Sequence, residues 1–128
     1  MNVIAENDYY KLAYDESKNR VLWRMIGFWK SLAVVPDFDK DWDRAQSLAK
    51  PGFTIYADLS KLEIMPPEVE KAQEERQKKL IHEGCRRVAC LIGKETSKIS
   101  LNKALKGSGM EKILRYCDSN KEAAEWLA

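Results

Sequence analysis

The sequence predicts one α/β domain with a mostly parallel five-stranded sheet and one antiparallel edge strand. Two short apolar runs, Phe53–Leu59 and Arg87–Ile92, show little alternation with polar residues, which is typical of strands buried on both faces. Segments of helical periodicity separate and follow these runs, and this alternation favours a parallel sheet with helical cover. A chain of 128 residues, 45% of them hydrophobic, is long enough for one core.

A β-hairpin is expected at the start of the domain. Tyr9–Tyr14 and Arg20–Trp29 have the composition of strands, and the polar segment Asp15–Asn19 between them has the composition of a turn. Gly27, inside the second strand, indicates a bulge or a close backbone approach. Ser31–Val35 fits either a loop or an early helical turn.

Four helices are expected after the hairpin, and the predicted order is β-β-α-β-α-β-α-β-α. Prolines begin the first two helices, because proline suits the first helical turn, and a capping box begins the fourth. The second helix is expected to be mostly solvated, with one apolar stripe. The predicted helix starts are Pro36, Pro66-Pro67, either Thr96 or Ser97, and Ser119. The later strands are Phe53–Leu59, Arg87–Ile92 and Lys112–Cys117. The apolar stripe of the second helix is Val69, Ala72, Leu80 and Ile81.

The charge of the chain indicates neither a nucleic-acid partner nor a membrane partner, since the net charge is only +2. Basic residues concentrate between Arg86 and Arg115, but no exposed-looking aromatic residues alternate with them, so a solvated basic face is expected. No apolar stretch is long enough to span a membrane, and Met1–Lys11 is polar and acidic, unlike a signal peptide. We therefore expect a soluble cytoplasmic protein.

No set of residues indicates a metal site, a cofactor or a catalytic centre. The alternating run of four aspartates that starts at Asp37 lacks the glycine and glutamate of a calcium-binding EF-hand loop. The three cysteines match no zinc-knuckle spacing and are expected to be reduced and buried. His82 is the sole imidazole base. We expect a protein that is not an enzyme, and the one arrangement to test for catalysis is Asp58 with Ser60 and Lys61.

Large aromatic residues gather in the hairpin and the first helix. Trp23 and Trp42 have the strand and helix spacing that is more typical of a core than of a ligand pocket. Phe28 and Trp29 stand together at a strand end beside Gly27, which is an unusual place for two large rings. This pair is the best indication of an apolar ligand site or an interface.

Three short motifs, taken in their order, resemble the STAS-like superfamily, which has the anti-sigma-factor antagonist fold. The motifs are Gly27-Phe28-Trp29 at the end of the second strand, Ala57-Asp58-Leu59-Ser60 at the end of the third, and Glu122–Leu127 in the last helix. Together they are similar to small stand-alone bacterial members of unassigned function. The resemblance spans about Tyr9 to Leu127, the core of a single predicted domain that comprises residues 1–128.

The resemblance implies a regulatory surface without its usual switch. In regulatory STAS proteins, a loop and a helix start that follow the third strand carry a phosphorylatable serine. That position falls here on Pro66-Pro67-Glu68-Val69, which contains no hydroxyl group. Glu68 could imitate the charge of a phosphoserine. Members of the fold group related to lipid-transfer domains bind apolar ligands instead.

Two functions are therefore expected from the sequence. The first is a non-enzymatic STAS-like interaction or regulatory domain whose partner is another protein or a second copy of the chain. The alternative is a domain that binds a small apolar ligand or lipid between the hairpin, the first helix and Trp29. Asp58 and Ser60 are expected at the carboxyl edge of the sheet, where open α/β sheets bind ligands. The residues expected to bind a partner or ligand are Asp58, Ser60, Lys61, Pro67, Glu68, Phe28 and Trp29.

Overall fold

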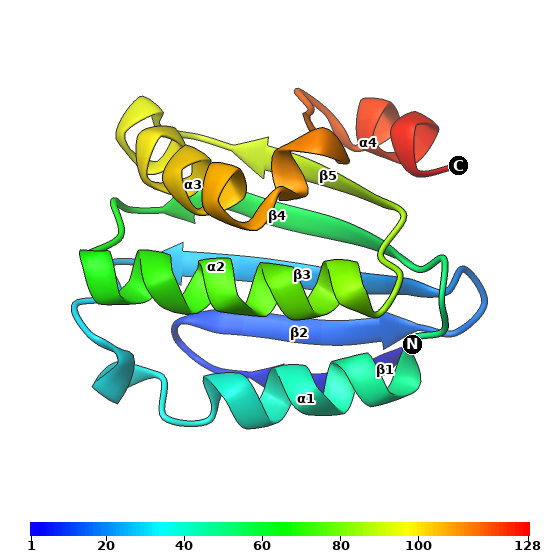
Figure 1. Ribbon diagram of the computed structural model, residues 1–128, viewed down its shortest axis with the longest axis horizontal. Helices are drawn as coiled ribbons and strands as arrows, with labels where there is room; N and C mark the ends of the chain where they lie inside the picture. The colour runs from blue at the N-terminus through cyan, green and yellow to red at the C-terminus, as the bar shows by residue number, and fades with distance from the viewer.

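A computed structural model describes residues 1–128 and contains a six-stranded mixed sheet in the order β1-β2-β3-β4-β5-β6 (Figure 1). The first three strands pair antiparallel, and β3, β4, β5 and β6 pair parallel. The strands are β1 (Asn2–Glu6), β2 (Tyr10–Asp15), β3 (Arg20–Gly27), β4 (Thr54–Leu62), β5 (Arg87–Ile92) and β6 (Leu114–Tyr116).

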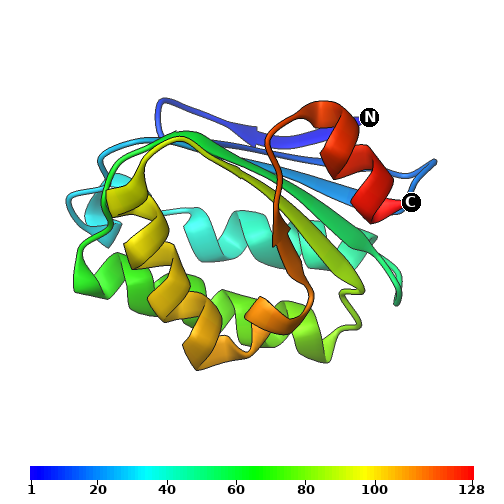
Figure 2. The same ribbon diagram turned by 90° about the horizontal axis from the view of Figure 1, so that it is seen from above.

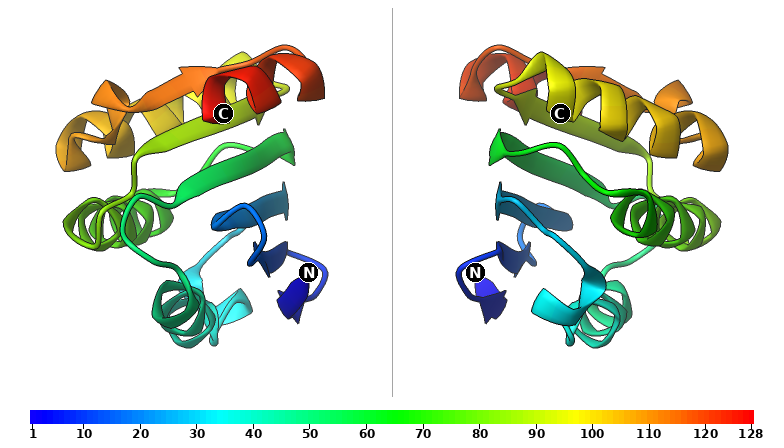
Figure 3. Two further views of the ribbon diagram at one scale, coloured as in Figure 1. Left: turned by 90° about the vertical axis from the view of Figure 1, so that its right-hand side faces the viewer. Right: turned by 90° about the vertical axis from the view of Figure 1, so that its left-hand side faces the viewer.

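Four α-helices cover the sheet unequally (Figures 2 and 3). The helices α1, α2 and α3 pack on one face, whereas α4 alone lies on the other face, over the β4–β5 side. The first three strands are therefore open on that second face. The helices are α1 (Phe38–Leu48), α2 (Pro67–His82), α3 (Glu95–Ser108) and α4 (Asn120–Leu127), with short 3₁₀ helices η1 (Leu32–Val34) and η2 (Met110–Lys112).

The prediction of five strands is wrong, because β1 adds a sixth strand at the N-terminal edge. β1 pairs antiparallel with β2 through a register that shifts between Val3 and Ala5. Its residues are mostly exposed, so the segment lacks the apolar alternation that indicates a strand. The strand that runs against the others is β2, and β1 places it inside the sheet rather than at the predicted edge.

The strand β4 continues beyond its predicted end at Leu59. The Asp58 carboxylate accepts hydrogen bonds from the backbone N–H of Ser60 at 3.1 Å and from its hydroxyl at 2.6 Å. This local turn accompanies a shift in the β3–β4 register between Arg24 and Ile26, which is typical of a β-bulge. The strand therefore extends to Leu62, and Asp58 lies within β4 instead of at the carboxyl edge.

A cluster of aromatic rings fills the space between the hairpin and α1. Trp23 lies at the centre, with ring centroids 5.0 Å from Trp42, 5.3 Å from Tyr10 and 6.0 Å from Phe38. Trp29 packs against Trp23, Tyr10 and Phe38. It has 1% of its surface exposed, and its indole N–H donates to the carbonyl of Tyr9 at 3.2 Å. Trp29 is thus part of the core, and the predicted pocket position is occupied by side chains.

The helix α4 packs on the sheet through the buried side chains of Ala123 and Leu127 and through the partly buried Trp126. The guanidinium groups of Arg87 and Arg115 lie 4.3 and 4.2 Å from the ring centroid of Trp126, as expected for cation–π contacts. The indole N–H of Trp126 donates to the carbonyl of Val88 at 3.0 Å. The serine half of the predicted capping box is confirmed, since the hydroxyl of Ser119 accepts from the backbone N–H of Glu122. The Glu122 carboxylate accepts from the backbone N–H of Asp118 at 3.0 Å instead of from that of Ser119.

The three cysteines are free and buried, as predicted. Burial raises the pKa of the Cys85 thiol to about 12 and also raises the pKa of Cys90.

None of the helices combines the length and the apolar character that a membrane crossing would need.

Candidate functional site

Three exposed apolar residues lie on segments at the end of the sheet where the parallel strands finish, the end that faces the viewer in the right panel of Figure 3. Phe28 follows β3 and is 51% exposed, Ile64 follows β4 and is 51% exposed, and Ile99 in the second turn of α3 is 57% exposed. Only two other large apolar residues in the chain are as exposed, Met1 and Val3 near the N-terminus. We call Phe28, Ile64 and Ile99, with Lys30 and Lys61, the carboxyl-edge surface.

Backbone hydrogen bonds hold the chain segments of this surface side by side. The backbone N–H of Glu63 donates to the carbonyl of Gly27 at 3.0 Å, which places Ile64 beside Phe28 on neighbouring segments. The backbone N–H of Met65 donates to the buried hydroxyl of Ser100 at 3.2 Å. These two bonds flank Ile64 in the chain, so the β4–α2 loop is fixed between the end of β3 and the start of α3.

A second buried hydroxyl explains why α3 does not begin with a serine cap. The hydroxyl of Ser97 donates to the carbonyl of Leu62 at 2.6 Å, and its side chain is fully buried. The prediction that Thr96 or Ser97 caps α3 is wrong, because the helix begins at Glu95 after Lys94. Ser97 instead fastens α3 to the end of β4.

The start of α2 is tied to the loop that follows β3. The Glu68 carboxylate accepts a hydrogen bond from the backbone N–H of Leu32 at 2.7 Å. Pro67 is the first residue of the helix, and its side chain is exposed. Glu68 therefore has a structural partner, and its charge also suits the N-terminal end of the helix dipole.

Charged residues of both signs lie on the segments around the carboxyl-edge surface, namely Lys30, Lys61, Lys94 and Lys98 with Glu63, Glu68 and Glu95. Lys30 and Lys61 are exposed and form no ion pair. Lys94 forms an ion pair with Glu63. Lys30 and Lys61 thus remain available to an external acidic group.

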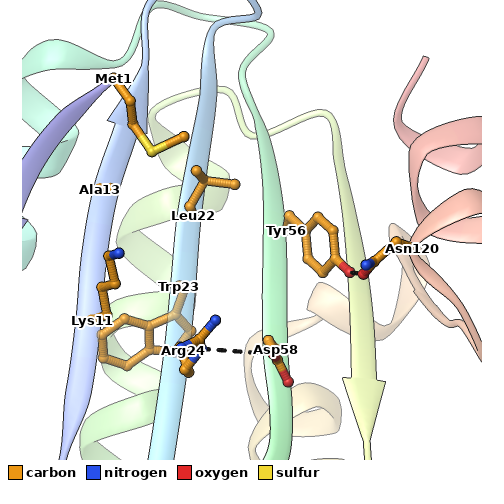
Figure 4. Close-up of a pocket in the computed structure, with 9 residues that line it drawn as sticks. All are labelled: Met1, Lys11, Ala13, Leu22, Trp23, Arg24, Tyr56, Asp58 and Asn120. Atoms are coloured by element: carbon orange, nitrogen blue, oxygen red, sulfur yellow. Dashed lines mark hydrogen bonds and ion pairs between the residues drawn. The ribbon is translucent and has the colours of Figure 1, made fainter.

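Asp58 lies away from this surface, in a groove of about 360 Å³ on the open face of the sheet (Figure 4). Lys11, Arg24 and Asp58 project from three neighbouring strands into one part of the groove, and Leu22 lies further along it. The Nε atom of Arg24 is 3.6 Å from an Asp58 carboxylate oxygen. The groove thus combines two cations and one carboxylate with an apolar floor.

The wall of this groove on the α4 side is a contact between two polar residues. The hydroxyl of Tyr56 donates to the side-chain oxygen of Asn120, the first residue of α4. Burial raises the pKa of the Tyr56 hydroxyl. The tyrosine therefore stays protonated at neutral pH and serves as a hydrogen-bond donor to α4.

In the arrangement of Asp58, Ser60 and Lys61, the one basic group in contact with the Ser60 hydroxyl is the Asp58 carboxylate. The short contact of Ser60 with Asp58 belongs to the local turn at the bulge. The sole histidine, His82, ends α2 at the opposite end of that helix from Pro67. No three residues with metal-ligating side chains lie together anywhere in the chain.

The structure thus divides the predicted residues among three places. Phe28, Ser60, Lys61, Pro67 and Glu68 lie near the carboxyl ends of the strands, Asp58 lies in the open-face groove, and Trp29 lies in the core. Sequence reasoning missed Ile64 and Ile99. Ile99 falls outside the inward-facing positions of α3, which indicates an exposed side chain. Ile64 lies in the short link between β4 and α2, where no periodicity distinguishes a buried side chain from an exposed one.

Comparison with known proteins identifies the fold without a family. The chain matches no protein-family profile and no curated protein. Among solved structures it is similar to the NMR structure of the protein TM1081, with a TM-score of 0.53 and 16% sequence identity. The match covers 96% of this chain and 90% of that chain. At this level of identity the similarity supports the common fold alone.

Proposed function

We propose that the protein is a non-enzymatic STAS-like interaction domain whose protein partner docks on the carboxyl-edge surface. The observation that carries this proposal is the presence of Phe28, Ile64 and Ile99, each about half exposed, on three segments that hydrogen bonds hold together. Exposed apolar groups gathered in one place are typical of interaction sites. Complete burial of such a side chain contributes about 1 kcal/mol of binding free energy, at roughly 25 cal/mol per Å².

The charges indicate the chemistry of the partner. Lys30 and Lys61 lie within three residues of Phe28 and Ile64 in the chain and form no ion pair. A partner with an apolar centre and acidic residues at its rim therefore complements this surface. Such rim charges mainly increase the association rate and its dependence on salt.

The proposed domain operates without a serine phosphorylation switch. Pro66-Pro67-Glu68-Val69 carries no hydroxyl to modify. Glu68 is engaged by the backbone of Leu32, which supports a fixed surface rather than one that a kinase changes. Partner binding would then depend on the amounts of the two proteins.

The test is a quantitative pull-down from a lysate of the source organism with three immobilised proteins. The variant Phe28→Ser/Ile64→Ser removes apolar area from the surface. The control Val3→Ser removes a similarly exposed apolar side chain from β1, an element that contributes no residue to the carboxyl-edge surface. We expect the wild type and Val3→Ser to retain the same stoichiometric partner and the double variant to lose it.

The isolated partner and light scattering then decide the result. The purified partner should bind the variant Lys30→Glu/Lys61→Glu more weakly than it binds the wild type. Undiminished binding of that partner to Phe28→Ser/Ile64→Ser would exclude the carboxyl-edge surface as the docking site. The absence of both a stoichiometric partner and self-association would reject an interaction domain altogether.

A second candidate function is the binding of a small molecule in the open-face groove. Its volume of about 360 Å³ lies within the usual range for ligand pockets. Lys11 and Arg24 would favour a ligand with an anionic group above the apolar floor at Leu22. Native mass spectrometry of freshly purified protein tests this function, and a mass equal to that of the bare chain would count against it.

A further inference from the structure

The helix α2 buries three polar side chains in addition to the apolar stripe that the sequence predicts. Gln73, Arg76 and Gln77 are 6%, 2% and 6% exposed and face the interior between Val69 and Leu80. Gln77 has a partner, since its side-chain oxygen accepts from the hydroxyl of Ser108 at 2.6 Å. The other two residues leave hydrogen-bonding capacity unused.

Three buried donors without protein partners belong to residues that line one interior cavity. The donors are the indole N–H of Trp42, the side-chain amide of Gln73 and the Nε–H of Arg76. All three residues line a cavity of about 40 Å³ between α2 and the sheet. A buried donor without a partner costs about 1–3 kcal/mol, so three around one space indicate a site for a hydrogen-bond acceptor.

The charge of Arg76 is already balanced outside the cavity. One terminal nitrogen donates to Asp43 at 3.0 Å and to Gln46, and the other donates to the side chain and the carbonyl of Asp39 at 3.0 and 3.1 Å. Only the Nε–H remains for the cavity. Because two carboxylates neutralise the guanidinium, a further anion gains little there, and a neutral acceptor fits better.

The remaining cavity wall is apolar. Twelve of its 15 lining residues are hydrophobic, and they include Leu101 and Leu105 of α3 and Met110 of η2. A single water needs roughly 10–15 Å³ of such space, so the cavity holds a molecule of a few heavy atoms. A ligand with its polar end at Trp42, Gln73 and Arg76 and its apolar body toward α3 would match both the buried donors and the apolar wall.

We propose that the cavity beneath α2 is a binding site for a small neutral molecule with an apolar body and one carbonyl-type oxygen. This site is separate from the carboxyl-edge surface, and its test is independent of the proposed interaction function. The carbonyl oxygen accepts from the donors of Trp42, Gln73 and Arg76. The flexible side chain of Met110 provides a wall that adapts to the size of the ligand.

The indole N–H of Trp42 gives a direct spectroscopic test. The indole groups of Trp29 and Trp126 donate to backbone carbonyls, so their NMR signals serve as internal controls. Three probes of the same shape separate the possibilities: acetone is neutral with an acceptor, acetate is its anionic counterpart and isobutene lacks the acceptor. We expect acetone to shift the Trp42 indole proton downfield in a saturable way and to leave the two controls unchanged.

The competing probes define the ligand class. Acetate and isobutene should bind at least about tenfold more weakly than acetone. Equal binding of acetate would overturn the neutral class, and equal binding of isobutene would overturn the role of the donors. A Trp42 signal that acetone leaves unchanged, together with an internal water detected at the indole, would show a hydration site only and overturn the proposal.

Two variants change the cavity in different ways. Gln73→Met keeps the length of the side chain and removes its donor, so the acetone affinity should fall by about fivefold or more. Val88→Ile adds one methylene to the lining and should reduce acetone binding without altering any donor. Since Gln73→Met removes a buried group that lacks a partner, its fold should persist. Acetone affinity that is unchanged in both folded variants would place the binding elsewhere.

Discussion

The Glu68 carboxylate accepts a hydrogen bond from the backbone N–H of Leu32 at 2.7 Å, so the first turn of α2 is tied to the loop after β3. This bond joins two segments 36 residues apart. The same glutamate lies in the first turn of α2. Its role in this chain is thus at least structural, and that role has a measurable consequence.

Substitution of Glu68 should lower the stability of the fold modestly. Glu68→Ala removes the acceptor for Leu32 and should reduce the free energy of unfolding by about 0.5–1.5 kcal/mol. Glu68→Gln keeps an oxygen at the same place and should lose less. Urea unfolding measures both variants. Glu70→Ala is the matched control, because Glu70 also lies in the first turn of α2, and an equal loss in this control would assign the effect to the helix dipole alone.

The buried guanidinium of Arg76 predicts an asymmetry between the two sides of its ion pairs. Arg76 is 2% exposed, whereas the side chains of Asp39 and Asp43 are 78% and 67% exposed. Arg76→Met leaves two carboxylates that water can solvate, so it should cost only about 1–2 kcal/mol. Asp39→Asn/Asp43→Asn leaves a buried cation without a counter-charge and should cost about 3–5 kcal/mol.

Chemical denaturation of these two variants at low and high salt checks the asymmetry. The aspartate double variant should be the less stable protein under both conditions. If Arg76→Met were the more destabilised variant, packing of the arginine stem rather than charge compensation would dominate this contact.

The parts of the fold that the sequence predicted are those with strong local signals. The helix α2 starts at the predicted double proline and ends before Gly84, whose φ of +97° is the left-handed conformation that favours glycine. The strand β5 has its predicted bounds, because an uninterrupted apolar run admits few alternatives. β1 was missed, since pairing with β2 and not its own apolar pattern makes it a strand.

The candidate sites depended on tertiary contacts that local patterns do not encode. Asp58 lies inside the sheet rather than at its predicted carboxyl edge, because a bulge at Ser60 extends β4. The sequence predicts that Gln73 and Arg76 lie on the solvated side of the second helix. In the structure, α1 supplies acidic partners that allow Arg76 to be buried. Their spacing of four and seven residues after Val69 is the one local signal that places them on the buried face of α2.

The stability of the fold should fall at alkaline pH because of its buried thiols. Burial raises the pKa of Cys85 to about 12 and raises the pKa of Cys90 as well. The unfolded chain releases these protons near the ordinary value of about 8.5. The stability contributed by the protonated thiols is therefore complete below about pH 8.5 and is lost as the pH rises toward about 12.

Urea unfolding at pH 7.5 and pH 9.5 measures this dependence. Each buried thiol should account for about 1 kcal/mol of the decrease between these values. Cys85→Ala/Cys90→Ala should retain the other pH effects and lose this part. If the double variant showed the same decrease as the wild type, the thiols would not be responsible.

Two glycines next to the β4 and α2 segments should respond in opposite directions to the same substitution. A Cβ atom at Gly93 would lie 2.3 Å from the backbone carbonyl oxygen of Ser60, which the β4 strand holds in place. A Cβ at Gly107 would meet the carboxylate end of Glu74, a side chain that can rotate away.

Gly93→Ala should therefore destabilise the fold by about 2 kcal/mol. Gly107→Ala lies within α3, where alanine is favoured over glycine by up to about 1 kcal/mol, and should be neutral or stabilising. Thermal unfolding of the two variants tests the close approach of β4 to the start of α3, and a Gly93→Ala protein as stable as Gly107→Ala would show that this approach is not required.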